Sequence, residues 1–299
     1  MMKCNNEKYG ETGKVRVIGR EDSLYPEKLY NLGKSAPEKL YCLGDTSLLN
    51  RKAAAVVGAR KATPYGKWAA YHIGRKLGER GVVTVSGLAY GCDAEAHRGA
   101  LQAGGPTIAV LGSGVSVCYP RRNQLIYDAI IEKGGLILSE HPPETDPLPP
   151  YFAERNRIIS GLSDLIVVTE AGISSGALIT AEFAAEQGRT VMAVPGNMNS
   201  LNSMGCNKLI QDGAAIVTSL SDILEELGVS GTYEKENPGE ELSDREKIVF
   251  DTVRQSSEIS VNLIARETGM KVSEVNSITA QLEIKGFVIT SMGKVCIAK

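Results

Sequence analysis

The chain has 299 residues, of which 42% are hydrophobic and 23% are charged, a balance typical of globular proteins. This length predicts two domains. The formal net charge of −2 excludes nucleic-acid binding through bulk positive charge, so any such site must be a local basic patch. No stretch approaches the roughly 20 apolar residues of a membrane helix, and residues 1–17 lack the apolar core of a signal peptide.

The cysteines indicate a reducing compartment. Six of them are scattered along the chain, and no two form a C-x-x-C pair. Such spacing is typical of separate thiols rather than of a disulfide framework or a zinc site. We therefore expect a cytoplasmic protein that binds no metal and, because the chain has no Walker A motif, does not use ATP. No cofactor is expected.

Residues 1–50 are interpreted as an N-terminal extension that packs on the core. A short helical piece is predicted around Tyr25–Leu32, and a strand-like run follows from Pro37 to Gly44.

Residues 51–228 alternate short apolar runs with longer segments of helical spacing. The predicted strands are Ala53–Val57, Val82–Ser86, Thr107–Leu111, Leu136–Ser139, Asp164–Thr169, Thr190–Val194 and Ala215–Thr218. The predicted helices between them include Tyr65–Arg80, Asp93–Ala103, Gln124–Lys133 and Gly176–Gln187. Strands of this kind alternating with helices predict an α/β fold, with a doubly wound, mostly parallel sheet that is covered on both faces.

The most informative segment for function runs from Arg51 to Lys76. It holds seven lysines or arginines and no acidic residue. The strand ending at Val57 leads into a loop with Gly58 and Arg60, and ligands of doubly wound sheets bind at such strand ends. Gly58 allows the backbone to approach a phosphate closely, and Arg60 offers a bidentate fork. The alternative is a solvated basic helix face beside an ordinary turn.

A second glycine-rich strand end follows Leu111. The residues Gly112, Ser113 and Gly114 could hold a phosphate with their backbone N–H groups. The pattern is not a G-x-G-x-x-G fingerprint, because Val117 stands where the third glycine belongs. Alone, this loop is weak evidence for a phosphate site.

A third segment joins aromatic and basic side chains. Prolines at 149 and 150 lead into a helix that carries Phe152, Arg155, Asn156 and Arg157. Bases stack on aromatic rings and arginines hold phosphates in proteins that bind single strands. The alternative is structural: Phe152 would lie in the core, and one of the arginines would pair with Glu140 or Glu170.

A fourth segment lies after the strand that ends near Glu170. A Gly/Ser-rich loop leads into a helix that opens at Ser175 and Gly176. The N-terminus of that helix is a candidate anion site, because its backbone N–H groups and dipole favour negative charge.

Candidate catalytic groups are few. Asp93 and His97 lie four residues apart on one predicted helix face, where an acid–base pair is one interpretation and the ordering of a loop at the helix start is the other. Glu140 and Glu170 are candidate general bases. No nucleophile elbow or three-ligand metal set occurs.

The last part of the chain changes in composition. Residues 229–241 are rich in glutamate and glycine and are interpreted as a linker. Residues 242–299 then predict three helices and a hairpin around Met292 and Gly293, with a capping box at Ser243 and Glu246 and a helix cap at Ser273. This order is typical of a winged helix-turn-helix.

Together these segments resemble the DprA/Smf family of bacterial DNA-processing proteins. The resemblance covers about residues 25–228 and rests on Val57-Gly58-Ala59-Arg60, Ser86-Gly87-Leu88-Ala89, Asp93, His97, Gly112-Ser113-Gly114, Tyr119-Pro120, Ser139-Glu140, Phe152, Arg155-Asn156-Arg157-Ile158-Ile159, Glu170-Ala171, Ser175-Gly176, Leu178, Thr180, Ala193-Val194-Pro195-Gly196, Gly205, Asn207, Leu209-Ile210 and Gly213-Ala214. Ala59 stands where family members often have serine.

The resemblance implies an extended Rossmann-like domain that forms a homodimer and binds single-stranded DNA without strong sequence preference. It also implies that the protein loads the RecA recombinase onto that DNA, bypasses single-strand-binding protein, and acts in natural transformation without catalysing a reaction. Carried onto this chain, Arg60 is the best phosphate contact; Phe152, Arg155, Asn156 and Arg157 come next, with Lys67 and Gly112–Gly114 in support.

Two alternatives of other classes stay open. One is a nucleotide phosphoribohydrolase-like enzyme, although the region from Glu170 to Gly176 lacks the P-G-G-x-G-T-x-x-E stretch of those enzymes. The other is a transcription regulator acting through the winged helix. Residues 242–299 carry eight Lys or Arg and seven Asp or Glu, which is less positive charge than duplex binding usually needs.

Overall fold

The computed structural model describes residues 14–229, 242–256, 258–284, 287–291 and 293–297. The chain forms two compact units, residues 1–230 and 231–299, which are considered separately below. The predicted linker lies almost entirely outside the described residues, as does Met292 of the predicted hairpin.

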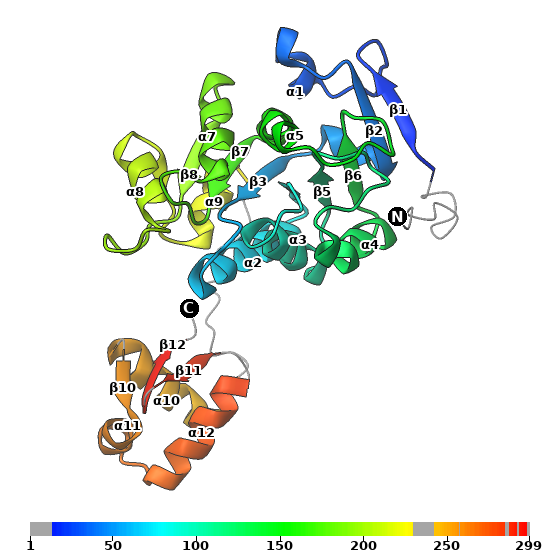
Figure 1. Cartoon of the computed structure of the whole chain (residues 1–299). Coiled ribbons are helices and arrows are strands. Elements are labelled where there is room, and N and C mark those ends of the chain that lie inside the picture. Colours follow the sequence, from blue (N-terminus) through cyan, green and yellow to red (C-terminus); the bar gives the residue numbers. More distant parts are fainter. Residues whose placement is uncertain (1–13, 230–241, 257, 285–286, 292, 298–299) are drawn as a thin grey trace. The chain divides into compact units, whose positions relative to one another are not determined.

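The first unit is built on a nine-stranded sheet (Figure 1). Its seven parallel strands are β3 (Ala53–Val57), β4 (Val83–Ser86), β5 (Thr107–Val110), β6 (Leu136–Ser139), β7 (Leu165–Val168), β8 (Thr190–Ala193) and β9 (Ala215–Ile216). The spatial order is β1-β2-β6-β5-β4-β3-β7-β8-β9. Each predicted strand is present to within two residues at either end, and the predicted α/β fold with a mostly parallel sheet is confirmed.

The N-terminal segment contributes strands of its own. β1 (Arg16–Gly19) pairs antiparallel with β2 (Lys39–Gly44), and β2 pairs antiparallel with β6. The segment therefore extends one edge of the sheet in addition to packing on it. Between the two strands lies α1 (Glu27–Tyr30), whose Leu29 is fully buried.

Helices cover both faces of the sheet. They are α2 (Pro64–Glu79), α3 (Cys92–Gln102), α4 (Gln124–Glu132), α5 (Pro149–Glu154), α6 (Asn156–Leu162), α7 (Gly176–Glu186), α8 (Met204–Gln211) and α9 (Leu220–Glu226). Side chains of β3 alternate between the two faces: Ala53, Ala55 and Val57 pack with α1, α6, α7 and α8, whereas Ala54 and Val56 pack with α2 and α9. This alternation explains why the strands are continuous apolar runs.

The second unit has a core of its own. It consists of α10 (Asp244–Ser256), α11 (Val261–Thr268), α12 (Val272–Ile284) and a three-stranded antiparallel sheet of β10 (Glu258–Ser260), β11 (Val288–Ser291) and β12 (Lys294–Ile297). The capping box of Ser243 and Glu246 is present. The predicted cap at Ser273 is wrong, because α12 already begins at Val272. Strand β10 was not predicted.

Among the described residues, no helix has the length and apolar character needed to cross a membrane.

Candidate functional site

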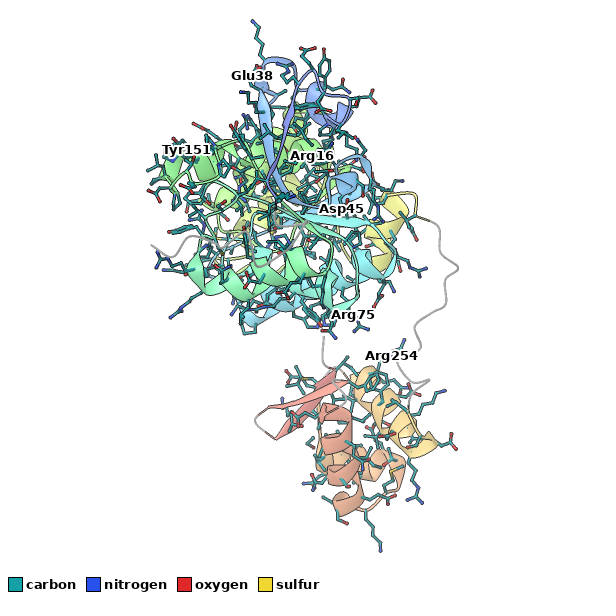
Figure 2. All side chains as sticks on the ribbon, turned by 90° about the vertical axis from the view of Figure 1, so that its right-hand side faces the viewer. Arg16, Glu38, Asp45, Arg75, Tyr151 and Arg254 are labelled. Atoms are coloured by element: carbon teal, nitrogen blue, oxygen red, sulfur yellow. The ribbon has the colours of Figure 1, made fainter. Side chains whose placement is uncertain are left out.

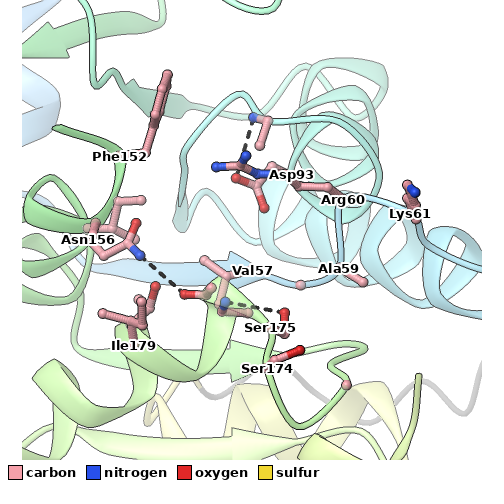
Figure 3. Close-up of a pocket in the computed structure, with 18 of the residues that line it drawn as sticks. Val57, Ala59, Arg60, Lys61, Asp93, Phe152, Asn156, Ser174, Ser175 and Ile179 are labelled. Carbon is pink, nitrogen blue, oxygen red and sulfur yellow. Dashed lines mark hydrogen bonds between the residues drawn. The ribbon is translucent and has the colours of Figure 1, made fainter. Parts of the chain in front are cut away.

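The main cleft of the first unit lies where the strand order reverses. β3 pairs with β4 on one side and with β7 on the other, so the chain leaves the carboxyl ends of β3 and β7 in divergent directions. Crevices at such switch points are the usual ligand sites of doubly wound sheets. Here the cleft has a volume of about 550 Å³ and is bounded by the loop after β3, by α5 and α6, and by the loop before α7 (Figure 3).

The loop after β3 supplies a basic wall. Arg60 and Lys61 line the cleft, and both are exposed to solvent. Among the described residues Arg60 forms no ion pair, although its charge is one of those that oppose the rise that burial causes in the pKa of Asp93. Its guanidinium is therefore available to an incoming anion.

An aromatic side chain stands beside this wall. The Arg60 guanidinium carbon lies 5.5 Å from the centroid of the Phe152 ring, a cation–π contact. On its other side Phe152 lies 5.4 Å from the half-exposed ring of Tyr119. Phe152 is partly exposed rather than part of the core, so a base can reach the edge of this aromatic pair.

The opposite wall is the N-terminus of α7. The Ser175 hydroxyl accepts a hydrogen bond from the backbone N–H of Ala177, and Ser174 beside it is exposed. Asn156 fixes this helix start, because its side-chain amide donates to the carbonyl of Gly176 over 3.2 Å. The helix dipole adds partial positive charge to a cleft that already holds two exposed cations, Arg60 and Lys61.

The base of the cleft holds two buried charged side chains, Asp93 and Arg155. The Asp93 carboxylate accepts backbone N–H bonds from Gly87 at 3.1 Å and Ala89 at 3.4 Å. Burial raises the pKa of Asp93, and the Arg155 guanidinium opposes that rise. Arg155 is only 4% exposed and donates to the carbonyl of Val110; burial lowers its pKa to about 10, against the opposing effect of Asp93.

Seven of the twelve predicted binding residues line the cleft. They are Gly58, Arg60, Phe152, Arg155, Asn156, Ser175 and Gly176. Lys67, Gly112, Ser113, Gly114 and Arg157 do not line it.

The residues outside the cleft have other surroundings. Arg157 forms a bidentate ion pair with Glu140, at 2.9 and 2.6 Å, as the structural alternative for that segment predicts. A Cβ at Gly112 would lie 2.9 Å from the Phe152 ring, so this glycine makes room for the aromatic side chain. Ser113 donates to the carbonyl of Val117, and Lys67 is exposed on α2.

Lys61 and Asn202 are among the cleft residues that were not predicted from the sequence. Lys61 lies in the basic segment and directly follows Arg60, so that segment already held the signal for it. Asn202 comes from the loop after β8, and its side chain donates to the carbonyl of Lys61 over 3.4 Å. In the sequence, only Pro195 and Gly196, at the end of the preceding strand, pointed to a loop at this place.

The candidate acid–base groups have structural partners. Glu170 is buried and accepts from the backbone N–H and the hydroxyl of Thr63, at 2.9 and 3.1 Å, ahead of α2. Asp93 and His97 do not pair: His97 bonds Thr107 instead, and Asp93 orders the Gly87–Ala89 loop. No group of three or more metal-ligating side chains occurs among the described residues.

The contact of Glu170 with α2 yields a stability prediction. A Cβ at Gly66 would lie 1.7 Å from the Glu170 carboxylate. Gly66→Ala should therefore displace Glu170 from Thr63 and lower the free energy of unfolding by about 2 kcal/mol, despite the better helix propensity of alanine. Thermal melting of the variant tests this. Gly176→Ala is the control, because nothing lies within 4 Å of a Cβ there, and equal melting of the two variants would contradict the contact.

Comparison with known proteins places this architecture in a family. The family model for DNA recombination-mediator protein A matches residues 16–228. The chain belongs to this family. It is 35% identical to the protein Smf of Escherichia coli, over 93% of this chain and 76% of that protein. It is 44% identical to the DNA processing protein DprA of Streptococcus pneumoniae, over 69% of this chain and 72% of that protein.

Solved structures of the DNA recombination-mediator A family share the fold. The crystal structure of DprA from Streptococcus pneumoniae superposes with a TM-score of 0.67 at 42% identity, over 74% of this chain and 76% of that one. DprA from Helicobacter pylori, whose structure addresses its single-stranded DNA binding mode, gives a TM-score of 0.65 at 30% identity, over 76% of this chain and 98% of that one.

Proposed function

We propose that this protein binds single-stranded DNA in the cleft at the carboxyl ends of β3 and β7. The observation that carries the proposal is the composition of the cleft walls. Two exposed cations, Arg60 and Lys61, face the N-terminus of α7, and Phe152 stands beside them. The two cations and the helix N-terminus suit phosphates, and the Phe152 ring suits a base.

The proposed contacts carry no sequence information. Arg60, Lys61, the Ser175 hydroxyl and the backbone N–H of Gly176 would hold phosphates, while the Phe152 ring would stack on a base of any kind. Gly58 lets the β3 loop approach the strand, and Asn156 keeps α7 in position. The binding of single-stranded DNA by the Helicobacter pylori relative supports this proposal.

The finer roles are proposed on the basis of the family resemblance. We propose that the protein is a non-catalytic recombination mediator in the cytoplasm that acts as a homodimer in DNA uptake. In that role it loads RecA onto the bound strand and works beside single-strand-binding protein. The family description as a recombination mediator supports this role.

The second unit is proposed to be a winged helix with an auxiliary function. The support is its order of three helices and a three-stranded sheet. Its nearly balanced charge favours contact with a protein over contact with duplex DNA. Sub-micromolar, sequence-dependent duplex binding by the full chain that is lost when residues 242–299 are removed would overturn this.

An enzyme of the phosphoribohydrolase class finds less support. Asp93 is the one carboxylate among the described residues that line the cleft, and backbone N–H groups already occupy it. Glu170, the other candidate base, is held by Thr63.

The proposal is tested with labelled oligo-dT and the matching duplex in anisotropy titrations of the full chain at two salt concentrations. Tight, salt-sensitive binding of the single strand in preference to the duplex is expected. Absence of binding at low salt would reject the proposal, and hydrolysis of nucleotides would then be screened.

Arg60→Ala should weaken binding of all sequences alike. Because one phosphate contact is lost, the slope of log K against log salt should become shallower by about 0.7, the value per phosphate of a single strand. Arg98→Ala, at an exposed arginine of α3 paired with Glu95, is the matched control and should leave the slope unchanged. Unchanged affinity of a folded Arg60→Ala protein would place the site elsewhere.

A further inference from the structure

The exposed face of α2 carries a row of aromatic side chains that neither the core nor the cleft uses. Tyr65, Trp68 and His72 follow each other at helical spacing, and Tyr65 and Trp68 are 41% and 36% exposed. The ring planes of Tyr65 and Trp68 lie within 13° of parallel, with centroids 6.3 Å apart. The His72 ring lies 4.8 Å from that of Trp68. We call these three side chains the α2 aromatic row.

Along the chain, the row begins shortly after the basic wall of the cleft. Arg60 and Lys61 line the cleft, and α2 starts at Pro64. The Tyr65 hydroxyl donates to the carbonyl of Pro195 over 3.1 Å, which fixes this end of the row at the carboxyl edge of the sheet. From Tyr65 to His72 a helix advances about 10 Å, the length of about three stacked nucleotides.

The surrounding charge suits a phosphate backbone. Arg51–Lys76 contains seven lysines or arginines and no acidic residue, and Lys67 on α2 is exposed. Arg75, labelled in Figure 2, follows the row along α2 and is exposed, although its Nε also pairs with Glu79 at 2.9 Å. A second copy of this chain is a poorer occupant, because a symmetric contact would place these cations against themselves.

We propose that a strand held in the cleft continues over the α2 aromatic row, where Trp68 stacks on a base outside the cleft. The inference rests on the proposed function and extends the site from the cleft to the surface of α2. Stacking on aromatic side chains beside a basic surface binds single strands of any sequence.

Trp68 is the single tryptophan of the chain, so its fluorescence reports this contact directly. We would titrate the full-length protein with unlabelled oligo-dT of about four nucleotides, which fills the cleft, and of about 12 nucleotides, which also reaches α2. The long oligonucleotide should quench Trp68, and the short one should do so much less. Anisotropy with labelled oligonucleotides, run in parallel, shows which of them bind.

Variants separate stacking from other effects. Trp68→Ala should weaken binding of the long oligonucleotide about tenfold and leave the short one unchanged. Trp68→Phe keeps an aromatic ring and should retain most of the affinity. Trp68→Phe keeps most of the packed ring, so its melting temperature should stay close to that of the wild type, and a cooperative melt of each variant confirms that the fold is intact.

The outcomes distinguish the two proposals. If the long oligonucleotide binds by anisotropy but does not quench Trp68, or if both lengths quench it equally, the path over α2 is wrong and the cleft proposal stands. Equal affinity of Trp68→Ala for the long oligonucleotide also rejects the path. If no oligonucleotide binds the wild-type protein at low salt, the cleft proposal itself fails.

Discussion

Replacing Arg155 with alanine is expected to lower the free energy of unfolding by about 3–5 kcal/mol. Arg155 is 4% exposed, donates to the carbonyl of Val110, and opposes the rise that burial causes in the pKa of Asp93. Without the guanidinium, Asp93 would remain buried without its cationic neighbour, and a cavity would open below Gly87, where a Cβ would lie 1.9 Å from Arg155. Denaturant unfolding measures the loss.

Two variants test this explanation. Asp93→Asn in the Arg155→Ala background should recover about 1–2 kcal/mol, because the uncharged amide oxygen can still accept from Gly87 and Ala89. Arg60→Ala is the matched control: it removes an exposed arginine of the same cleft and should change DNA binding but not stability. If Arg155→Ala is as stable as the wild type and only DNA binding falls, Arg155 is a direct DNA contact instead.

Arg60 and Arg155 show which parts of the site could be predicted from the sequence and which could not. Gly58 and Arg60 could be placed at a strand end because a run of buried apolar residues stops at Val57, and that rule holds in the structure. Arg155 also follows aromatics in a helical segment, yet it is buried. Residue type and spacing are similar for an arginine that faces solvent and for one that lies under the cleft, because burial depends on segments far away in the sequence.

The dependence of burial on distant segments also explains where the predicted and the observed fold differ. The parallel strands were predictable because their side chains are buried on both faces, which makes them continuous apolar runs. The edge strand β1 is only four residues long and buries a single side chain, that of Ile18, so its pattern is weak. The segment predicted as one helix after Pro149 is two helices that meet at Arg155, and no glycine or proline marks the boundary between them.

The second large effect is expected in the pH dependence of stability. His97 is fully buried, and its Nδ1 lies 2.7 Å from the Thr107 hydroxyl. That hydroxyl donates to the carbonyl of Thr84, so it accepts from His97, and Nδ1 carries the proton. Nε2 is then an unprotonated nitrogen, and it is buried without a hydrogen-bond partner among the described residues. Burial, with a smaller effect from Arg155, lowers the pKa of His97 to about 3.

The direction of the effect follows from this lowered pKa. Between about pH 6.5 and about pH 3 the unfolded chain binds a proton that the folded chain does not, so acid favours unfolding. Stability should fall by about 1.4 kcal/mol for each pH unit between about pH 6 and about pH 4, beyond the contribution of the carboxylates. Trp68 fluorescence follows the first unit alone, because the chain has no other tryptophan.

His97→Gln isolates the contribution of this side chain. Its amide can still donate to Thr107 but takes up no proton. The variant should therefore lose some stability at neutral pH, and its free energy of unfolding should fall less steeply with pH in acid, by the contribution of one bound proton. Parallel profiles for His97→Gln and the wild type would mean that the folded protein protonates His97. The buried neutral imidazole would then be the wrong description of the contact between α3 and β5.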